Sequence, residues 1–117
     1  PDTEMGEGNV ILEQVIVEAG CRIGNCNLFF GGSILGHDSE VGDYNSFSVA
    51  AATAGYVSIQ DHVFMGVSAK VKDHIVIDSY GFVGADAYVN KDLRTYQVLA
   101  APRSDILKDK TSIGMAY

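Results

Sequence analysis

A strict six-residue repeat of apolar residues constrains the fold of this chain more than any other feature. It runs from Met5 to Val89 without an insertion or deletion, and only Thr53 among its members is not plainly apolar. Helices repeat every 3.6 residues and ordinary strands every 2, whereas a period of six is typical of hexapeptide-repeat β-helices. The members, called rungs below, are Met5, Ile11, Val17, Ile23, Phe29, Leu35, Val41, Phe47, Thr53, Ile59, Met65, Val71, Ile77, Val83 and Val89.

A second series lies two residues before each rung and is mostly small or β-branched, as at Cys21, Ser33 and Ala51. Alternate residues of a strand share a face, so both series are predicted to point into one core. Three hexads complete a triangular coil in which residues eighteen apart stack. We predict an all-β, parallel β-helix of about five coils over residues 1–94, about 24 Å tall at about 4.8 Å a coil. A β-sandwich has no reason to hold one phase for so long.

Residues 95–117 are predicted to form a C-terminal extension. Residues 90–94 follow the last rung and are expected to leave the coil, and residues 95–101 are typical of a strand. Residues 104–110 are predicted to form a short helix with Ser104 as its N-cap, followed by a loose tail. At the other end, the coil at Met5 has no evident cap, so we expect a further domain or a neighbouring chain to cover it.

The charge is distributed unevenly along the chain. Residues 1–69 hold nine acids and one base, a net charge of −8, whereas residues 70–117 hold six acids and seven bases, a net charge of +1. An acidic chain is a poor non-specific binder of nucleic acid, and a polyanionic ligand is expected towards the C-terminal half. We see neither a transmembrane run nor a signal peptide. Cys21 and Cys26 lack zinc spacing, so we expect free thiols in a reducing cytoplasm.

The turn Gly36-His37-Asp38 is the first candidate for chemistry. Gly55 lies eighteen residues after His37 and is predicted to stack directly beside it. A glycine there leaves a backbone N–H approachable, as a developing oxyanion requires. Thr53, the one polar rung, lies two residues before Gly55, and breaks in a pattern are expected at functional sites.

A second candidate is the column formed by Gly66 and Gly84, which are also eighteen residues apart. Their neighbours Val67 and Ala85 are small and stack in the same way. We predict a bare groove along this edge, in which a long, thin ligand lies against the backbone. The alternative is that glycine after a rung is ordinary turn chemistry.

These motifs resemble those of the hexapeptide-repeat acyltransferases, and most closely the bacterial branch that acetylates nucleotide-linked amino sugars and sialic acid (PglD- and NeuD-like enzymes). The resemblance implies a left-handed β-helix and a homotrimer. It also implies that acetyl-CoA binds between neighbouring subunits, and that the acetyl group passes to the amine or hydroxyl of a sugar or nucleotide-sugar acceptor. The stretches that carry the resemblance are 34–44, 48–51, 54–55, 63–67, 83–85, 89–92 and 101–103.

The resemblance also assigns roles to individual residues. His37 would be the general base, Asp38 would orient or polarise it, and Gly55 would donate its N–H to the oxyanion. Relatives of this branch carry an N-terminal domain that holds the nucleotide sugar, so we expect such a domain to belong with this chain. No metal is expected. The residues assigned to acetyl-CoA are Gly66, Val67, Gly84 and Ala85 along the pantetheine arm, and Lys91 and Arg103 at the CoA phosphates.

Two other functions were weighed. A zinc enzyme like the γ-class carbonic anhydrases needs three histidines that meet at a trimer interface, but the spacing of His37, His62 and His74 does not resemble that family. His62 and His74 both follow a rung by three positions and are expected to face solvent. A non-catalytic β-helix that serves assembly is the stronger alternative. N-acetyl and O-acetyl transfer both stay open.

Overall fold

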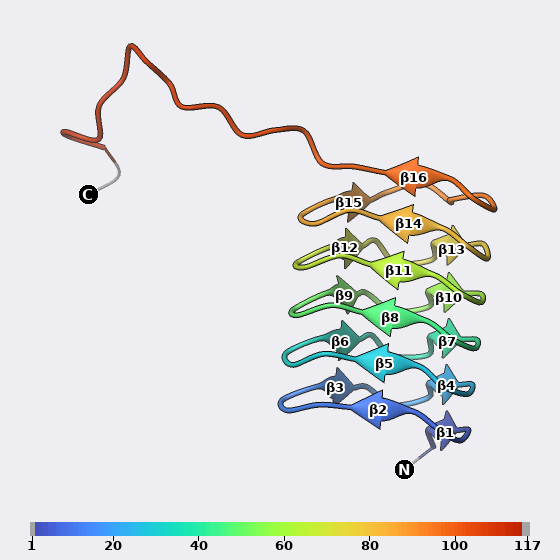
Figure 1. Cartoon of the computed structure of the whole chain (residues 1–117). Helices are drawn as coiled ribbons and strands as arrows, with labels where there is room; N and C mark the ends of the chain where they lie inside the picture. The colour runs from blue at the N-terminus through green and yellow to red at the C-terminus, as the bar shows by residue number, and fades with distance from the viewer. Residues whose placement is uncertain (1, 116–117) are drawn as a thin grey trace.

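The computed structural model describes residues 2–115, which form a stack of short parallel strands of two residues each (Figure 1). The strands are β1 (Glu4–Met5), β2 (Val10–Ile11), β3 (Ile16–Val17), β4 (Arg22–Ile23), β5 (Leu28–Phe29), β6 (Ile34–Leu35), β7 (Glu40–Val41), β8 (Ser46–Phe47), β9 (Ala52–Thr53), β10 (Ser58–Ile59), β11 (Phe64–Met65), β12 (Lys70–Val71), β13 (Val76–Ile77), β14 (Phe82–Val83), β15 (Tyr88–Val89) and β16 (Val98–Leu99).

Three parallel sheets form the walls of a triangular prism. Sheet A holds β1, β4, β7, β10 and β13, sheet B holds β2, β5, β8, β11, β14 and β16, and sheet C holds β3, β6, β9, β12 and β15. In Figure 1 the chain crosses the front along sheet B from right to left, returns behind through sheets C and A, and climbs by one coil, which is a left-handed winding. The predicted all-β, left-handed parallel β-helix of about five coils is confirmed.

The register follows the predicted step of eighteen residues. Met5 pairs with Ile23 at one end, and Val71 pairs with Val89 at the other. At each corner from Gly8 to Asp86, the residue three positions after the rung has a φ between 56° and 79°. L-residues rarely adopt this conformation, so the stacking of the coils must hold it in place.

One continuous core fills the prism. The rungs from Ile23 to Val89 are buried, as is the second series from Cys21 to Ala87. The buried Asn27 and Asn45 extend a ladder from Asn9, because each side-chain oxygen accepts a hydrogen bond from the backbone N–H one coil on, at 2.7–2.8 Å. The polar members of the core are therefore satisfied, as buried polar groups must be.

The C-terminal part of the prediction needs correction. Leu93 bridges to Ile77 and β16 pairs with β14, so the coil continues past Val89 instead of ending there. Both steps are sixteen residues long, because this coil is two residues shorter than the others. The short helix predicted at 104–110 does not form: the segment runs away from the prism (Figure 1), and Ile106 is 93% exposed. A helix this short is marginal in water without a surface to pack against.

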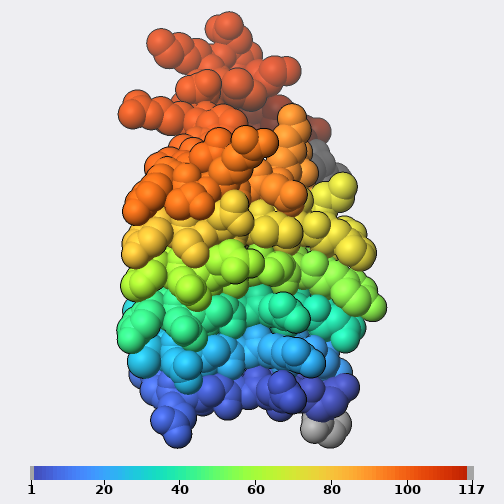
Figure 2. Space-filling view, turned by 90° about the vertical axis from the view of Figure 1, so that its right-hand side faces the viewer, coloured from blue at the N-terminus to red at the C-terminus, as the bar shows by residue number. Residues whose placement is uncertain are grey.

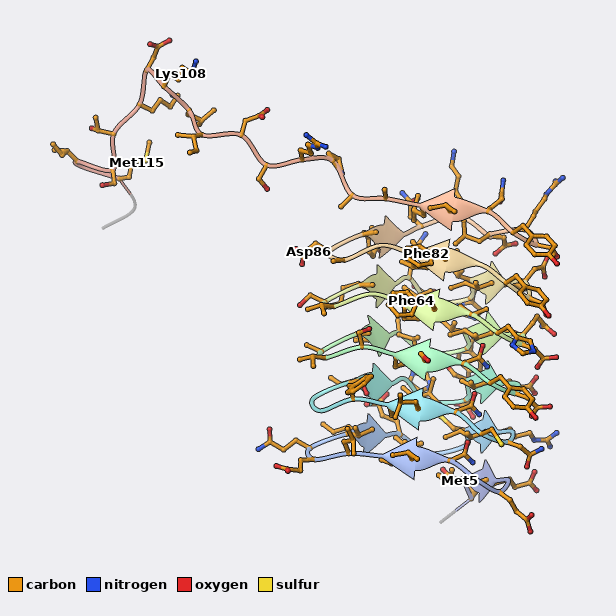
Figure 3. The ribbon with its side chains drawn as sticks, in the orientation of Figure 1. Met5, Phe64, Phe82, Asp86, Lys108 and Met115 are labelled. Atoms are coloured by element: carbon orange, nitrogen blue, oxygen red, sulfur yellow. The ribbon has the colours of Figure 1, made fainter. Side chains whose placement is uncertain are left out.

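The three sheets present different outer faces. Figure 2 shows the coils as flat layers, and Figure 3 shows Phe64 and Phe82 standing one above the other on sheet B. Their ring centroids lie 4.9 Å apart. Within the described residues, no helix has the length and hydropathy needed to span a bilayer. Outward side chains are mostly polar on sheet A (Glu4, Arg22, Glu40, Ser58) and mostly apolar on sheets B (Val10, Leu28, Phe64, Phe82, Val98) and C (Ile16, Ile34, Tyr88).

The first coil is open at its outer end. Met5 and Ile11 are rungs, yet they are 46% and 38% exposed because no coil lies beneath them in the described residues. The expectation that another domain or chain covers this end stays a prediction, as does the division of the chain at residue 94.

Candidate active site

Most of the candidate residues from the sequence lie at the corners of the prism, whereas Arg103 lies on the segment after β16. Corner CA, where the chain passes from sheet C to sheet A, carries His37, Asp38 and Gly55. Corner BC carries the column of Gly66 and Gly84. Corner AB carries His62.

The imidazole of His37 lies against Gly55 of the next coil at corner CA, as the step of eighteen predicts. A Cβ atom placed on Gly55 would lie 2.5 Å from Nε2 of His37 and 2.6 Å from its Cε1. The other ring nitrogen, Nδ1, is 3.0 Å from Oδ2 of Asp38. Both side chains are about half exposed. The imidazole therefore has one nitrogen held by a carboxylate and the other beside a residue that only glycine can occupy without displacing it.

The carboxylate of Asp38 is itself held by the corner. Asp38 has a φ of 56°, and its N–H donates to the carbonyl of Ala19 in the coil below at 3.0 Å. A Cβ on Gly20 would collide with Oδ1 of Asp38. The carboxylate therefore occupies space that is open only because residue 20 is a glycine. A carboxylate fixed against Nδ1 sets the orientation of the imidazole ring.

The backbone amide of Gly55 is available for the predicted oxyanion role. Gly55 is buried and lies against the imidazole of His37. Its carbonyl accepts from the N–H of His74 at 3.2 Å, whereas its own N–H donates to no atom of residues 2–115. Whether it binds an oxyanion stays a prediction.

Thr53 explains the single break in the apolar repeat. Its Oγ1 accepts the N–H of Gly36 at 3.0 Å in a buried hydrogen bond. Here β6 pairs with β9 only through Ile34 and Ala52. The Thr53 hydroxyl therefore accepts the Gly36 N–H in place of a backbone carbonyl. On the other side, the thiol of Cys21 donates to the carbonyl of Gly36 at 3.1 Å. Burial raises the pKa of the Cys21 thiol, which keeps it in the protonated form that can donate.

Replacing Thr53 by valine is expected to leave the N–H of Gly36 buried without a partner. The free energy of unfolding should fall by about 1–3 kcal/mol, the usual cost of such an orphaned group. Amide hydrogen exchange should show the Gly36 N–H losing its protection, whereas Thr53→Ser, which keeps the hydroxyl, should retain it. Equal protection of this amide in the two variants would contradict the assigned role.

Sequence reasoning missed one residue of this turn. The N–H of His37 donates to Oε1 of Glu18 at 2.9 Å, so a side chain from the coil below also holds the backbone of His37 in place. Glu18 stands eighteen residues before Gly36, the residue ahead of His37. The same stacking rule could have identified it, had it been applied to polar neighbours of the turn.

Corner BC has the bare column that the sequence predicts. A Cβ on Gly66 would lie 2.6 Å from the backbone nitrogen of Ala85, and one on Gly84 would lie 3.3 Å from the carbonyl oxygen of Leu99. Val67 and Ala85 are exposed beside them, and within residues 2–115 neither donates its N–H to a hydrogen bond. Asp86 marks this corner at the left of Figure 3. A ligand at this edge can approach the backbone closely.

The structure does not bring all of the predicted site residues together within one chain. Sheet C separates corner CA from corner BC, so His37 and Gly66 belong to different edges of the prism. Lys91 follows Val89 of sheet C and therefore lies at corner CA, two coils beyond Gly55. Arg103 is exposed on the segment that follows β16.

The other two histidines lie on exposed turns, as the sequence predicts, and their neighbouring side chains differ. His62 is stacked between Tyr44 and Tyr80 at corner AB, with ring planes within 6°. His74 lies at corner CA, with Nδ1 at 2.7 Å from Oδ2 of Asp73. Among the described residues, no three histidines, cysteines or carboxylates are grouped so as to hold a metal ion.

No protein-family profile matches the chain. Among curated proteins, it is 38% identical over 66 residues to the acyl-[acyl-carrier-protein]--UDP-N-acetylglucosamine O-acyltransferase of Anaeromyxobacter sp. (strain K), and 32% identical over 69 residues to the protein of that name from Alkalilimnicola ehrlichii. These matches take in 50% and 53% of this chain. They cover 26% and 27% of the relatives, so the chain spans about a quarter of their length.

Solved structures share the fold over 86% of this chain. LpxA from Acinetobacter baumannii is 31% identical with a TM-score of 0.84, and a variant of perosamine N-acetyltransferase from Caulobacter crescentus, in complex with CoA and GDP-perosamine, is 29% identical with a TM-score of 0.85. The acetyltransferase domain of PglB from Neisseria gonorrhoeae, in complex with acetyl coenzyme A, is 21% identical with a TM-score of 0.84 and shows the fold alone. The matches cover 42%, 48% and 49% of those chains.

The fold and these neighbours define a class of protein. The predicted resemblance to the hexapeptide-repeat acyltransferases is confirmed, because a perosamine N-acetyltransferase shares the fold at 29% identity and the curated relatives are O-acyltransferases. Within that class, the similarity to a perosamine N-acetyltransferase supports the branch that acts on sugars.

Proposed function

We propose that the chain is the β-helix part of an acetyl-CoA-dependent acetyltransferase, with an amino sugar or a sialic-acid-type sugar as acceptor. The observation that carries this proposal is the imidazole of His37, held by Asp38 on one nitrogen and placed beside Gly55 at the other. General bases in acyl transfer are most often histidines positioned in this way.

The proposed reaction gives each of these groups a role. Nε2 of His37 takes a proton from the acceptor amine or hydroxyl as its nitrogen or oxygen attacks the thioester carbonyl carbon. The negative charge that develops on the carbonyl oxygen is stabilised by the N–H of Gly55. The carbon–sulfur bond then breaks, and the proton held by His37 passes to the departing CoA thiolate. Asp38 stabilises the imidazolium between the two steps.

The acetyl-CoA would lie along corner BC. Gly66 and Gly84 leave room against the backbone, and the free N–H groups of Val67 and Ala85 suit the amide carbonyls of the pantetheine arm. Lys91 and Arg103 stay the candidates for the CoA phosphates, where charge-assisted hydrogen bonds are strongest. The variant of perosamine N-acetyltransferase was solved with CoA, which supports this cosubstrate.

A homotrimer would bring the two halves of the site together. Each chain carries the base at corner CA and the groove at corner BC, on either side of sheet C. In a ring of three copies, corner CA of one copy can face corner BC of the next, because such head-to-tail contacts close into rings. The apolar outer faces of sheets B and C supply the surface for that contact. The cytoplasmic location stays a prediction.

Release of free CoA thiol from acetyl-CoA in the presence of candidate acceptors tests the proposal. Nucleotide-linked 4-amino sugars should support release if the chain is an N-acetyltransferase, and sialic acid should if it is an O-acetyltransferase. The assay needs the chain together with any domain that holds the acceptor. No release above the spontaneous rate with any acceptor would favour the non-catalytic assembly module.

A further inference from the structure

The rings at corner CA continue above the candidate base. Tyr56 lies one coil beyond Asp38, and His74 lies one coil beyond Tyr56. The ring of Tyr56 meets the imidazole of His37 nearly at right angles, with centroids 5.2 Å apart and an interplanar angle of 85°. Its other neighbour is the imidazole of His74, stacked at 4.9 Å with planes 16° apart. Tyr56 therefore contacts one imidazole in the coil before it and another in the coil after it.

The backbone fixes the height and direction of these rings. The N–H of Tyr56 donates to the carbonyl of His37 at 2.9 Å, and the N–H of His74 donates to the carbonyl of Gly55 at 3.2 Å. Tyr56 and His74 both have positive φ, near 60°. The backbone therefore fixes the positions from which the two rings project.

His74 is itself held by a hydrogen bond to Asp73. The 2.7 Å contact between Nδ1 of His74 and Oδ2 of Asp73 is shorter than the equivalent contact between His37 and Asp38. The hydrogen bond from His74 lowers the pKa of the Asp73 carboxyl, which is the sign of a bond that favours the ionised acceptor. The imidazole of His74, which stacks on Tyr56, therefore has its orientation fixed by a hydrogen bond.

We propose that Tyr56 is a positioning residue for His37. The imidazole of His37 contacts both Gly55 and the ring of Tyr56, which are consecutive residues of the next coil, so the tyrosine ring keeps it against the glycine with Nδ1 on Asp38. The imidazole of His74, which is hydrogen-bonded to Asp73, stacks on Tyr56 and holds it in that position. The effect of Tyr56 on the rate of acetyl transfer rests on the proposed function, whereas its effect on the position of the His37 imidazole does not.

Corner AB shows that stacking alone does not produce this arrangement. Tyr44, His62, Tyr80 and Tyr96 form a column there with ring centroids 4.8–5.1 Å apart, and each consecutive pair of planes lies within 17°. The perpendicular approach occurs at corner CA, where the ring below belongs to the residue before the corner position. Tyr80 is therefore a matched control, because it has the same corner conformation and two stacked neighbours but no contact with His37.

Three variants, Tyr56→Ala, Tyr56→Phe and Tyr80→Ala, test the proposal kinetically in the acetyl-transfer assay. Tyr56→Ala should lower kcat about tenfold and leave the KM for acetyl-CoA unchanged, because the ring contact orients the base and does not bind cosubstrate. Tyr56→Phe should restore kcat, and Tyr80→Ala should not lower it. An unchanged kcat in Tyr56→Ala, or an equal loss in Tyr80→Ala, would overturn the assignment.

Proton NMR provides a readout that needs no turnover. Nuclear Overhauser contacts between the ring protons of His37 and the α-protons of Gly55 should be present in the parent and in Tyr80→Ala, and should be lost in Tyr56→Ala. If they persist in Tyr56→Ala, the positioning role is wrong whatever the activity. If they are lost while the parent shows no turnover with any acceptor, the positioning role stands and the proposed function fails.

Discussion

Replacing His37 by alanine is expected to lower kcat for acetyl transfer by about 10²–10⁴-fold, the range that a positioned general base contributes. The imidazole is the group at corner CA that combines a carboxylate partner with a bare neighbouring backbone. The KM for acetyl-CoA should change little, because the predicted CoA groove lies at corner BC. The measurement is the rate of free thiol release at saturating acetyl-CoA.

Two observations make that result interpretable. The side chain of His37 is 53% exposed, so its loss should change the free energy of unfolding by only about 0.5 kcal/mol. His62→Ala is the control, since it removes an exposed imidazole from corner AB and should retain the parent rate. A His37→Ala variant that turns over as fast as the parent would remove His37 from the mechanism.

Replacing Gly55 by alanine is expected to lower kcat by about 10²-fold with little loss of stability, because a misplacement near 1 Å is enough for that effect. The added methyl would lie 2.5 Å from Nε2 of His37. What it meets is the end of a half-exposed side chain, so the imidazole swings aside and the fold persists. Steady-state kinetics and thermal unfolding of the same preparation separate the two effects.

Gly36→Ala gives the contrasting outcome. The methyl there would collide with the backbone carbonyl of Ala54, which cannot move without breaking the coil. Stability should fall by about 1–3 kcal/mol or more, as expected for overpacking. If Gly55→Ala were instead the more destabilised of the two and kept the parent kcat, the imidazole would not depend on the bare glycine.

Counting along the sequence predicted the parts of the structure that depend on the repeat. A period of six determines which residues point inward, and a step of eighteen determines which ones stack, so the pairing of His37 with Gly55 followed from arithmetic alone. The repeat also contained a signal that was not used. Gly66 follows a rung of sheet B whereas His37 follows a rung of sheet C, so sorting the rungs by wall would have placed them at different corners.

Other features lay outside what the repeat could reveal. Leu93 and Leu99 continue the coil although it is two residues shorter than the others. A count in steps of six or eighteen therefore no longer identifies the paired residues there. The contact between Tyr56 and His37 depends on side-chain directions set by a positive φ at the corner. Ser104 as a candidate N-cap suggested a helix at 104–110, but no part of residues 2–115 covers Ile106 there.

Activity of a mixed oligomer tests most directly whether corner CA of one copy and corner BC of another form the site. His37→Ala removes the base, and Ala85→Trp fills the exposed groove without touching the core. Each variant alone should be inactive. Co-expressed in equal amounts, they should recover about a quarter of the parent's active sites, since random assembly of a ring pairs an intact base with an intact groove at that frequency. A mixture no more active than its two separate components would contradict a site shared between copies.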